Sequence, residues 1–358
     1  AAQEKRHVPA PIGTTLERFC GSRAYGDNVN VSFSEAIRTC IEGIPRGRVA
    51  TCGTVARALG DARAANAVAE WLREHPDLAE GHRVVLADGR TVQGEASRLL
   101  GTEGLLDSKG HPVRERFLET LPEVPLFRQL REEQERLASR IVESDPQEDV
   151  DTYGGADVSY EGDRAFAVAV TIDAQSLEPV EIAIRETEVG LPYVPTYLAF
   201  REFPAIEAAV HHLSRRPDVL FIDGHGRLHP RHFGFACYAG ILLDTPTVGI
   251  AKHLLVGKLG SKRHANQDAL PIQLDGEVLG LAWRPPRSSR PVYISVGNHV
   301  SLEGALNLTR RATKEKYPEP LRIADRISKE KRKKKNAERS ASEQTARSRP
   351  PAQGPPGV

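Results

Sequence analysis

The spacing of apolar residues changes character near Phe127 of this chain. Before that point, Val31 to Arg73 has the three-to-four-residue apolar spacing of amphipathic helices, with a break at Gly60. After it come apolar runs of strand length, the later ones separated by helical stretches: RAFAVAVTID, VEIAIRETE, DVLFIDGHG, TVGIAK and VYISVGN. The second part therefore predicts an α/β fold, a mixed sheet flanked by helices whose first two strands pair antiparallel. Since 358 residues exceed one ordinary core, we expect two domains.

Composition limits the classes of protein to consider. Hydrophobic residues make up 39% and charged residues 27% of the chain, as in ordinary globular proteins. No apolar stretch approaches the roughly 20 residues that cross a bilayer, and residues 1–15 lack the apolar centre of a secretion signal. We therefore expect a cytoplasmic protein with no membrane partner. The cysteines at 20, 40, 52 and 237 form no CxxC pair, which argues against a zinc site or a disulfide scaffold.

The helical first part resembles a small DNA-binding module in its pattern. TVARALG and RAANAVAEWLREH are two short helices joined by a Gly-Asp turn, which favours a helix-turn-helix. HRVVLADGRTVQG then alternates as the strand and turn of a wing would. We expect a winged-helix domain over residues 31–121 after an N-terminal extension of residues 1–30. Any helical hairpin can imitate this pattern, so the motif alone does not settle the function.

A basic run lies close to the C-terminus. Lys329 to Arg339 contains seven Lys or Arg residues and two Glu, although the whole chain carries a formal net charge of only +1. Without apolar periodicity, residues 329–358 are predicted to be a disordered basic tail. Such a tail would attract phosphates in a salt-sensitive way, or would serve only to keep the protein in solution.

Three acidic residues stand at predicted element ends. Asp157 is placed just before a strand in GGADVSY, Asp223 ends the strand VLFID, and Glu202 lies in FRE. Carboxylates from several elements can together hold magnesium, which activates water and stabilises the leaving oxygen in phosphodiester hydrolysis. Any one of these acids alone is better explained as a helix cap or a surface salt bridge. The glycines beside Asp157 and Asp223 favour the site, because they leave room for a close approach.

Six motifs in order resemble those of endonuclease V. They are GADVSY, LPYVPTYLAFRE, DVLFIDGHGRLHPRHFG, TPTVGIAKHLLVG, ISVGNHVSLEGA and PEPLRIAD, and they span about residues 127–328. The resemblance implies an RNase H-like domain over residues 122–328 that acts on DNA containing deaminated bases. It implies hydrolysis of the second phosphodiester 3′ to deoxyinosine, leaving 3′-hydroxyl and 5′-phosphate ends. The implied cofactor is Mg²⁺, with Mn²⁺ as a substitute.

The same resemblance assigns catalytic roles residue by residue. Asp157 and Asp223 match the principal metal ligands, and Glu202 matches the third active-site carboxylate. Asp325 matches a fourth position that is Asp or His among relatives, with a helix-surface acid as the alternative. Lys252 matches an active-site lysine that would neutralise the scissile phosphate, with a solvated strand-end lysine as the alternative.

Recognition of a damaged base in a duplex requires a wedge and a pocket. The resemblance assigns the wedge to Pro192, Tyr193, Val194 and Pro195, in which two prolines fix the backbone and the tyrosine can stack. Backbone groups around Gly224 would read the extruded base, and His229 matches a family histidine near the site. Where relatives commonly have glycine after the wedge, this chain has Thr196, which predicts a stiffer or differently angled wedge.

The first domain resembles the DNA-binding domain of alkylguanine-DNA alkyltransferases, especially the alkyltransferase-like proteins. The resemblance covers IPRGRVATCGTVARALGDARAANAVAEWLREHPDLAEGHRVV and the later RLLGTEGLLDSKGHPVRERF. The acceptor cysteine of active enzymes is replaced by Gly81, so alkyl transfer there is chemically excluded. The residues expected to contact DNA, with solvated surface side chains as the alternative, are Arg48, Arg63, Asn66 and Arg83.

Three functions remain open at this point. The leading prediction is a DNA repair endonuclease whose first domain tethers it to DNA. One rival cleaves inosine in RNA, and the other is a lesion sensor that binds without cutting. A first domain used for protein contacts, or a vestigial one, is the alternative to the DNA tether.

Overall fold

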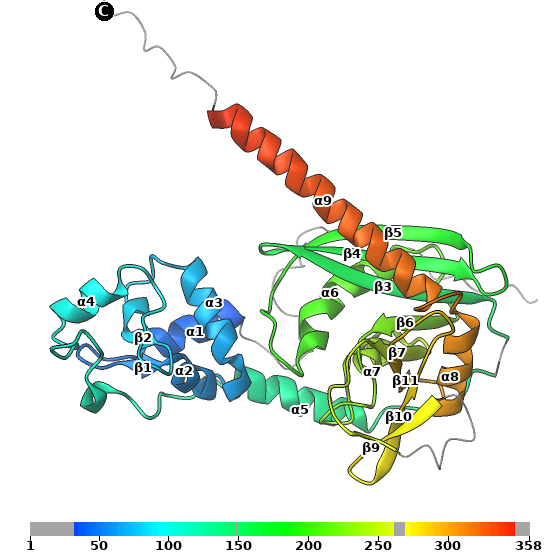
Figure 1. Ribbon diagram of the computed structural model, residues 1–358, viewed down its shortest axis with the longest axis horizontal. Helices are drawn as coiled ribbons and strands as arrows, with labels where there is room; N and C mark the ends of the chain where they lie inside the picture. The colour runs from blue at the N-terminus through cyan, green and yellow to red at the C-terminus, as the bar shows by residue number, and fades with distance from the viewer. Residues whose placement is uncertain (1–31, 148, 261–268, 348–358) are drawn as a thin grey trace, which may run out of the picture.

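The computed structural model describes residues 32–147, 149–260 and 269–347 (Figure 1). The predicted N-terminal extension lies outside the described residues. The front domain is built from short helices and a two-stranded parallel sheet. Its elements are α1 (Phe33–Glu42), β1 (Ala50–Thr51), α2 (Cys52–Ala58), α3 (Ala65–Glu74), β2 (Val84–Val85) and α4 (Ala96–Thr102).

Local sequence explains where the front helices begin. Ser32 caps α1 through a reciprocal bond with Glu35, and Thr51 caps α2 by accepting from the backbone of Thr54. A turn at Gly60, which has φ +100°, and Asp61 then separates α2 from α3. The helix pair joined by a Gly-Asp turn is therefore present as the sequence predicts.

The second domain is organised around one mixed sheet with the order β5-β4-β3-β6-β7-β11-β10-β9-β8. Parallel pairing joins β3 to β6 and β6 to β7 in its centre, and antiparallel pairing joins the rest. The strands are β3 (Thr152–Glu161), β4 (Arg164–Asp173), β5 (Pro179–Glu188), β6 (Val219–Asp223), β7 (Thr247–Ala251), β8 (Lys258–Leu259), β9 (Ala269–Leu274), β10 (Glu277–Trp283) and β11 (Val292–Asn298).

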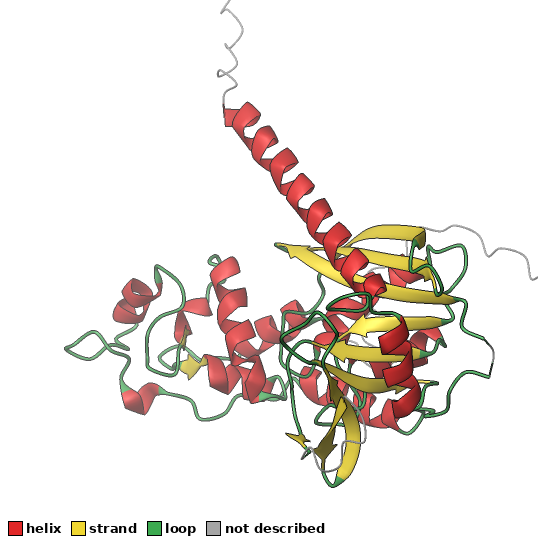
Figure 2. Ribbon diagram, turned by 45° about the vertical axis from the view of Figure 1, so that its right-hand side comes forward, coloured by secondary structure: helices red, strands yellow, loops and turns green. Residues whose placement is uncertain are grey.

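Helices cover both faces of this sheet (Figure 2). On one face α6 (Leu198–Val210) and α7 (Phe235–Leu243) pack against the strands, and on the other face α8 (Leu302–Arg311) and α9 (Glu319–Arg347) do so. The predicted mixed sheet flanked by helices is confirmed, including the antiparallel pairing of β4 with β5. Within the described residues, no helix is both long and apolar enough to cross a membrane.

One helix, α5 (Leu126–Ala138), connects the two domains. The backbone N–H groups of Val124 and Phe127 donate to the last carbonyls of α2, those of Ala58 and Leu59, at 2.9 and 2.8 Å. Apolar residues of α1, α2 and α3 continue through α5 into those of α6 and α7 as one buried cluster. The front domain therefore packs directly onto the sheet domain.

Two sequence predictions need correction. Asp157 lies inside β3 rather than before a strand, because the glycines that suggest a turn are strand residues packed against other segments. The predicted disordered tail is helical as far as Arg347, where α9 ends. Lys, Arg, Glu and Ala are good helix formers, so the basic run continues the helix begun by the buried PEPLRIAD segment. Residues 348–358 lie outside the described part of the chain.

Candidate active site

Asp157 and Asp223 lie side by side on neighbouring parallel strands. Ala156 of β3 is paired in register with Ile222 of β6, so the next residue of each strand is the aspartate. Residues in register on parallel strands point to the same face, which here is the face covered by α9. The hydroxyl of Ser328, on α9, donates to Oδ2 of Asp157 at 2.5 Å.

Glu202 and Asp325 approach this pair from helices on opposite faces. Burial, with smaller contributions from the charges of Asp325 and Asp223, raises the pKa of Asp157 to about 6 although the bond from Ser328 lowers it. Burial, with smaller contributions from the charges of Asp157 and Asp223, raises the pKa of Glu202 to about 8. Such mutual effects require short separations, because Coulomb interactions are screened over longer ones. The sheet edge thus gathers the four predicted carboxylates into one electrostatic environment.

Lys252 directly follows β7 and forms an ion pair with Asp223. Its Nζ lies 2.6 Å from Oδ2 of that aspartate, and 51% of its side chain remains exposed. Tyr317 donates to the other oxygen, Oδ1, at 3.1 Å, and its ring lies under the Lys252 ammonium at 4.9 Å. Burial raises the pKa of Tyr317 well above 10, so its hydroxyl stays a neutral donor.

Three hydroxyl residues hold these acids and are not among the predicted site residues. They are Tyr317, Ser328 and Tyr160, whose hydroxyl donates to Oε1 of Glu202 at 3.1 Å. Each has a usable signal in the sequence. Tyr160 and Ser328 each stand three residues after a predicted acid, and Tyr317 precedes the PEPLRIAD motif.

The donor chemistry of this site fits a divalent cation. Carboxylate oxygens are the ligands that Mg²⁺ prefers. Burial and the nearby acids raise the pKa values of Asp157 and Glu202, and a bound cation would favour the ionised form of both groups. Among the described residues, no three acidic, histidine or cysteine side chains are already arranged to hold a metal ion. Asp157 and Asp223 instead accept from Ser328 and Lys252.

A cavity of about 190 Å³ opens next to the C-terminal end of β6. Gly224 and His225, which follow Asp223 directly, line it together with Tyr193 and Phe235. Pockets for drug-sized ligands measure roughly 300–1,000 Å³, so this one suits a single base-sized group. The side chain of Tyr193 is 58% exposed. The predicted wedge tyrosine and the predicted base-contacting glycine therefore border the same cavity.

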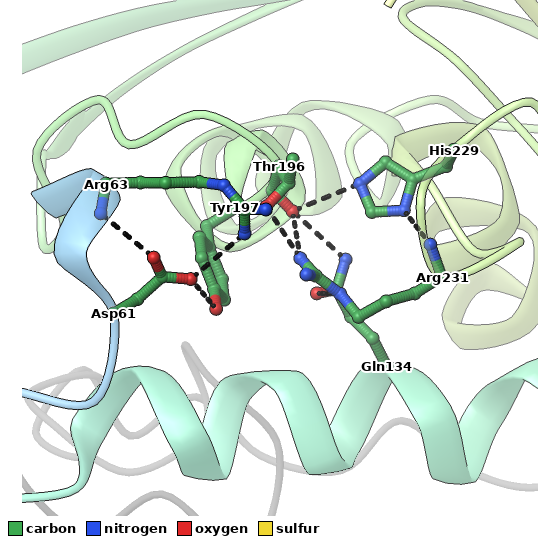
Figure 3. Close-up of polar contacts among 7 residues, drawn as sticks. All are labelled: Asp61, Arg63, Gln134, Thr196, Tyr197, His229 and Arg231. Atoms are coloured by element: carbon green, nitrogen blue, oxygen red, sulfur yellow. Dashed lines mark hydrogen bonds and ion pairs between the residues drawn. The ribbon is translucent and has the colours of Figure 1, made fainter. Parts of the chain in front are cut away.

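The backbone beyond the wedge is held in an unusual conformation. Thr196 has φ +74°, in the left-handed region that glycine adopts readily and a β-branched residue rarely does. Its carbonyl accepts from Arg231 at 2.8 Å, from His229 Nε2 at 3.2 Å and from Gln134 at 3.3 Å, and its hydroxyl also accepts from Arg231 (Figure 3). The chain thus follows a path suited to glycine while hydrogen bonds from three side chains hold it.

His229 contacts this segment rather than the carboxylates. Its Nδ1 accepts from the backbone N–H of Arg231 at 3.3 Å, so Nε2 carries the proton donated to Thr196. Burial, together with the charge of Arg231, lowers the pKa of His229 to about 3, so the ring is neutral. The geometry suits a role in positioning the wedge, and direct participation of His229 in catalysis stays a prediction.

The predicted DNA contacts of the front domain differ in accessibility. Arg63 and Asn66 are exposed, and Arg48 is half-buried and donates to the carbonyl of Phe117. Arg83 is mostly buried, where it forms an ion pair with Glu103 at 2.8 Å. A contact between Arg83 and phosphate would require this ion pair to open.

The position of the missing acceptor cysteine is filled from the side. A Cβ atom on Gly81 would lie 2.7 Å from the Gln93 side-chain nitrogen. That nitrogen donates to the carbonyls of Leu72 and His75 at 3.2 and 2.9 Å. The amide of Gln93 therefore occupies the space that a side chain at residue 81 would need.

Comparison with known proteins agrees with this arrangement of two domains. A family model described as Endonuclease V matches residues 135–326. A second one, described as 6-O-methylguanine DNA methyltransferase, DNA binding domain, matches residues 32–109. The protein is therefore a nuclease with a fused DNA-binding domain of the alkyltransferase type.

Individual relatives narrow the identification. Endonuclease V of Thermofilum pendens is 44% identical over 207 residues, which are 57% of this chain and 88% of that protein. The crystal structure of Endonuclease V from Streptomyces avermitilis has a TM-score of 0.54 at 34% identity and covers 57% of this chain and 92% of its own. Endonuclease V of Ciona intestinalis, crystallised with DNA containing an inosine followed by a ribo-adenosine, has a TM-score of 0.54 at 29% identity, covering 58% and 98%. This chain belongs to the endonuclease V family.

Proposed function

We propose that this protein is a DNA repair endonuclease that recognises deaminated bases, above all deoxyinosine, and cuts the strand with a divalent cation. The proposed cut is hydrolysis of the second phosphodiester 3′ to the lesion, leaving 3′-hydroxyl and 5′-phosphate ends. The observation that carries the proposal is the juxtaposition of the acid cluster with the cavity. Asp223 belongs to the cluster, while the next two residues line the cavity. An extruded base and a backbone phosphate a short distance along the strand would then be bound together.

The proposed metal ligands are Asp157, Asp223 and Glu202, with Asp325 as the fourth acid nearby. A bound Mg²⁺, or Mn²⁺ in its place, supplies a water of lowered pKa and charge stabilisation for the leaving oxygen. Tyr160 and Ser328 hold the carboxylates by donating to one oxygen of Glu202 and of Asp157. The second oxygen of each carboxylate is thereby left to face a ligand.

Lys252 is the proposed phosphate contact. Its half-exposed ammonium stands at the open side of the cluster, where the negative charge of the scissile phosphate would arrive. A fixed cation at that point stabilises the charge that develops on the phosphoryl oxygens. Tyr317 orients both Lys252 and Asp223, since its ring lies against the ammonium and its hydroxyl donates to the carboxylate.

Base recognition is assigned to the cavity and the segment Pro192–Pro195. Tyr193 and Pro195 are exposed and Val194 is buried, so the segment is anchored by Val194 and presents its flanking residues outward. Tyr193 would stack on the bases that remain after the lesion leaves the helix. Hypoxanthine would enter the cavity beside Gly224, where backbone groups can read its edge.

A cleavage assay tests this function. The protein is incubated with Mg²⁺ and matched strands that contain inosine in DNA, inosine in RNA or no lesion, and the cut is mapped. We expect a nick at the second phosphodiester 3′ to inosine in DNA. We also expect Asp157→Asn and Asp223→Asn to lose cutting while they retain DNA binding. Cutting of RNA alone would favour an endoribonuclease, and binding without cutting would favour a sensor. Full Mg²⁺-dependent cleavage by Asp223→Asn would refute the site.

A further inference from the structure

The front domain contacts the lesion-recognition segment through its helix-turn-helix turn (Figure 3). Asp61, in the turn between α2 and α3, accepts a hydrogen bond from the hydroxyl of Tyr197 at 2.8 Å. Tyr197 follows the wedge by two residues and is fully buried. This bond therefore joins the helix-turn-helix turn of one domain to the proposed base-recognition element of the other.

The contact is firmly built on the front-domain side. One Asp61 carboxylate oxygen accepts from the backbone N–H of Arg63 at 2.9 Å, and the other accepts from the Arg63 guanidinium at 3.2 Å and from Tyr197. Only 8% of the Asp61 side chain is exposed. A buried carboxylate with three donors is fixed in position, so it can hold the tyrosine that bonds to it.

Aromatic packing reinforces the same connection. Phe33 of α1 meets Phe127 of α5 at 6.2 Å between ring centroids, and Phe127 meets Tyr197 at 5.1 Å. Arg231 stacks on the Tyr197 ring at 4.8 Å while it holds the carbonyl and hydroxyl of Thr196. Residues 196 and 197 are thus held by contacts with the front domain, with α5 and with the nuclease loop that carries Arg231.

We propose that the front domain positions the lesion-recognition wedge, with Asp61 and Tyr197 as positioning residues. The helix-turn-helix turn then serves as an internal support for the nuclease, and not only as a surface that holds DNA. Arg63, which is half-exposed, forms an ion pair with Asp61 within the same turn. This inference rests on the proposed function, because it explains how the wedge is held while it unpairs a base in duplex DNA.

The decisive comparison uses inosine in a duplex and inosine in the same strand left unpaired. A wedge matters most where a base has to be unstacked and unpaired, and least where the base is already exposed. We expect Asp61→Ala to lower the single-turnover nicking rate at saturating protein about tenfold on the duplex, which corresponds to about 1.4 kcal/mol. On the single strand we expect a change of less than about twofold. Tyr197→Phe, which removes only the hydroxyl, should give the same pattern.

Asp88→Ala is a matched control within the front domain. Asp88 accepts from the backbone and side chain of Arg90, two residues further on, just as Asp61 does from Arg63, and is exposed. We expect this variant to nick both substrates like the wild type. We also expect the double variant to be no worse on the duplex than Asp61→Ala alone, because each single variant already removes the bond between Asp61 and Tyr197.

The outcomes separate the inference from the proposed function. If the wild type nicks neither substrate, the proposed function fails. If the wild type nicks both, while Asp61→Ala and Tyr197→Phe match Asp88→Ala on the duplex, the positioning role is overturned. Equal losses on duplex and single strand would also overturn it, since they indicate a general loss of folding or binding. Should Asp61→Ala fail to fold, as judged by circular dichroism, Tyr197→Phe alone decides.

Discussion

Replacing Glu202 by glutamine should stabilise the metal-free protein while abolishing its activity. Burial, together with the charges of Asp157 and Asp223, raises the pKa of Glu202 to about 8 from an ordinary value of 4.5. The folded protein therefore holds a proton that the unfolded chain releases above about pH 4.5. Stability falls as the pH rises from about 4.5 to about 8, because there the native state binds more protons. Glutamine is neutral at every pH and avoids this loss.

The size of the effect follows from the pKa difference. Keeping the proton at about pH 7.5 means holding it three pH units above the ordinary value, and each unit corresponds to about 1.36 kcal/mol, or about 4 kcal/mol in total. A proton can also bind to a neighbouring acid, and side chains relax around the charge. We therefore expect Glu202→Gln to raise the free energy of unfolding by about 1–3 kcal/mol. For a unit of this size, that gain raises the melting temperature by about 3–10 °C.

Thermal melts followed by circular dichroism in the presence of a chelator measure this gain. We expect Glu202→Gln to melt above the wild type at about pH 7.5, and the difference to shrink to about 1 °C near pH 5. Glu188→Gln, which changes an exposed glutamate at the end of β5, is the matched control and should leave the melting temperature unchanged. A Glu202→Gln variant that is no more stable than the wild type at about pH 7.5 would refute the view that the site is strained by buried negative charge.

Further predictions concern the surroundings of the cluster. Lys252→Ala should lower the maximal nicking rate about 100-fold with little change in duplex affinity, whereas an equal loss in affinity would argue for a simple binding role. Tyr317→Phe removes the 3.1 Å hydrogen bond to Asp223. It should lower the nicking rate about tenfold and raise the Mg²⁺ concentration required for half-maximal activity, and an unchanged Mg²⁺ titration would contradict this. Gly155→Ala places a Cβ 2.3 Å from the carbonyl carbon of Pro320, so α9 must shift. Denaturant titrations should then show a free energy of unfolding that is lower by about 2–3 kcal/mol.

The parts of the site that were predictable from sequence are those where an acid or base ends a continuous apolar strand. Asp223 closes VLFID and Lys252 follows TVGIA, so their placement at one sheet edge follows from the pattern itself. Asp157 was misplaced relative to its strand, since Gly154 and Gly155 suggest a turn. In the folded protein these glycines make room for Pro217 and Pro320, which lie too close for any Cβ. That requirement comes from distant segments and leaves no local signal.

The remaining differences are also tertiary in origin. The strands β9 and β10 lack a strong apolar alternation and form through pairing with β11 and with each other. Tyr197 looks like one more aromatic residue in LPYVPTYLAFRE, and only packing shows that its hydroxyl reaches Asp61. Helix α9 extends through the basic run because its buried first turns start a helix that charged residues can continue. Local propensity therefore gives the elements, while the interdomain contact depends on the complete fold.

The conformation of Thr196 supplies a physical reason for such a contact. A threonine in the left-handed region costs about 1–2 kcal/mol, and strained residues persist only where their surroundings over-determine them. Here Arg231, His229 and Gln134 all donate to one carbonyl. The next residue, Tyr197, is fixed from the front domain. A wedge that displaces a base from a stacked duplex needs this rigidity. In a flexible loop, the binding energy would deform the loop before it displaced the base. The contact between the front domain and Tyr197 thus makes the wedge more rigid. A glycine at position 196 would leave the same loop more flexible.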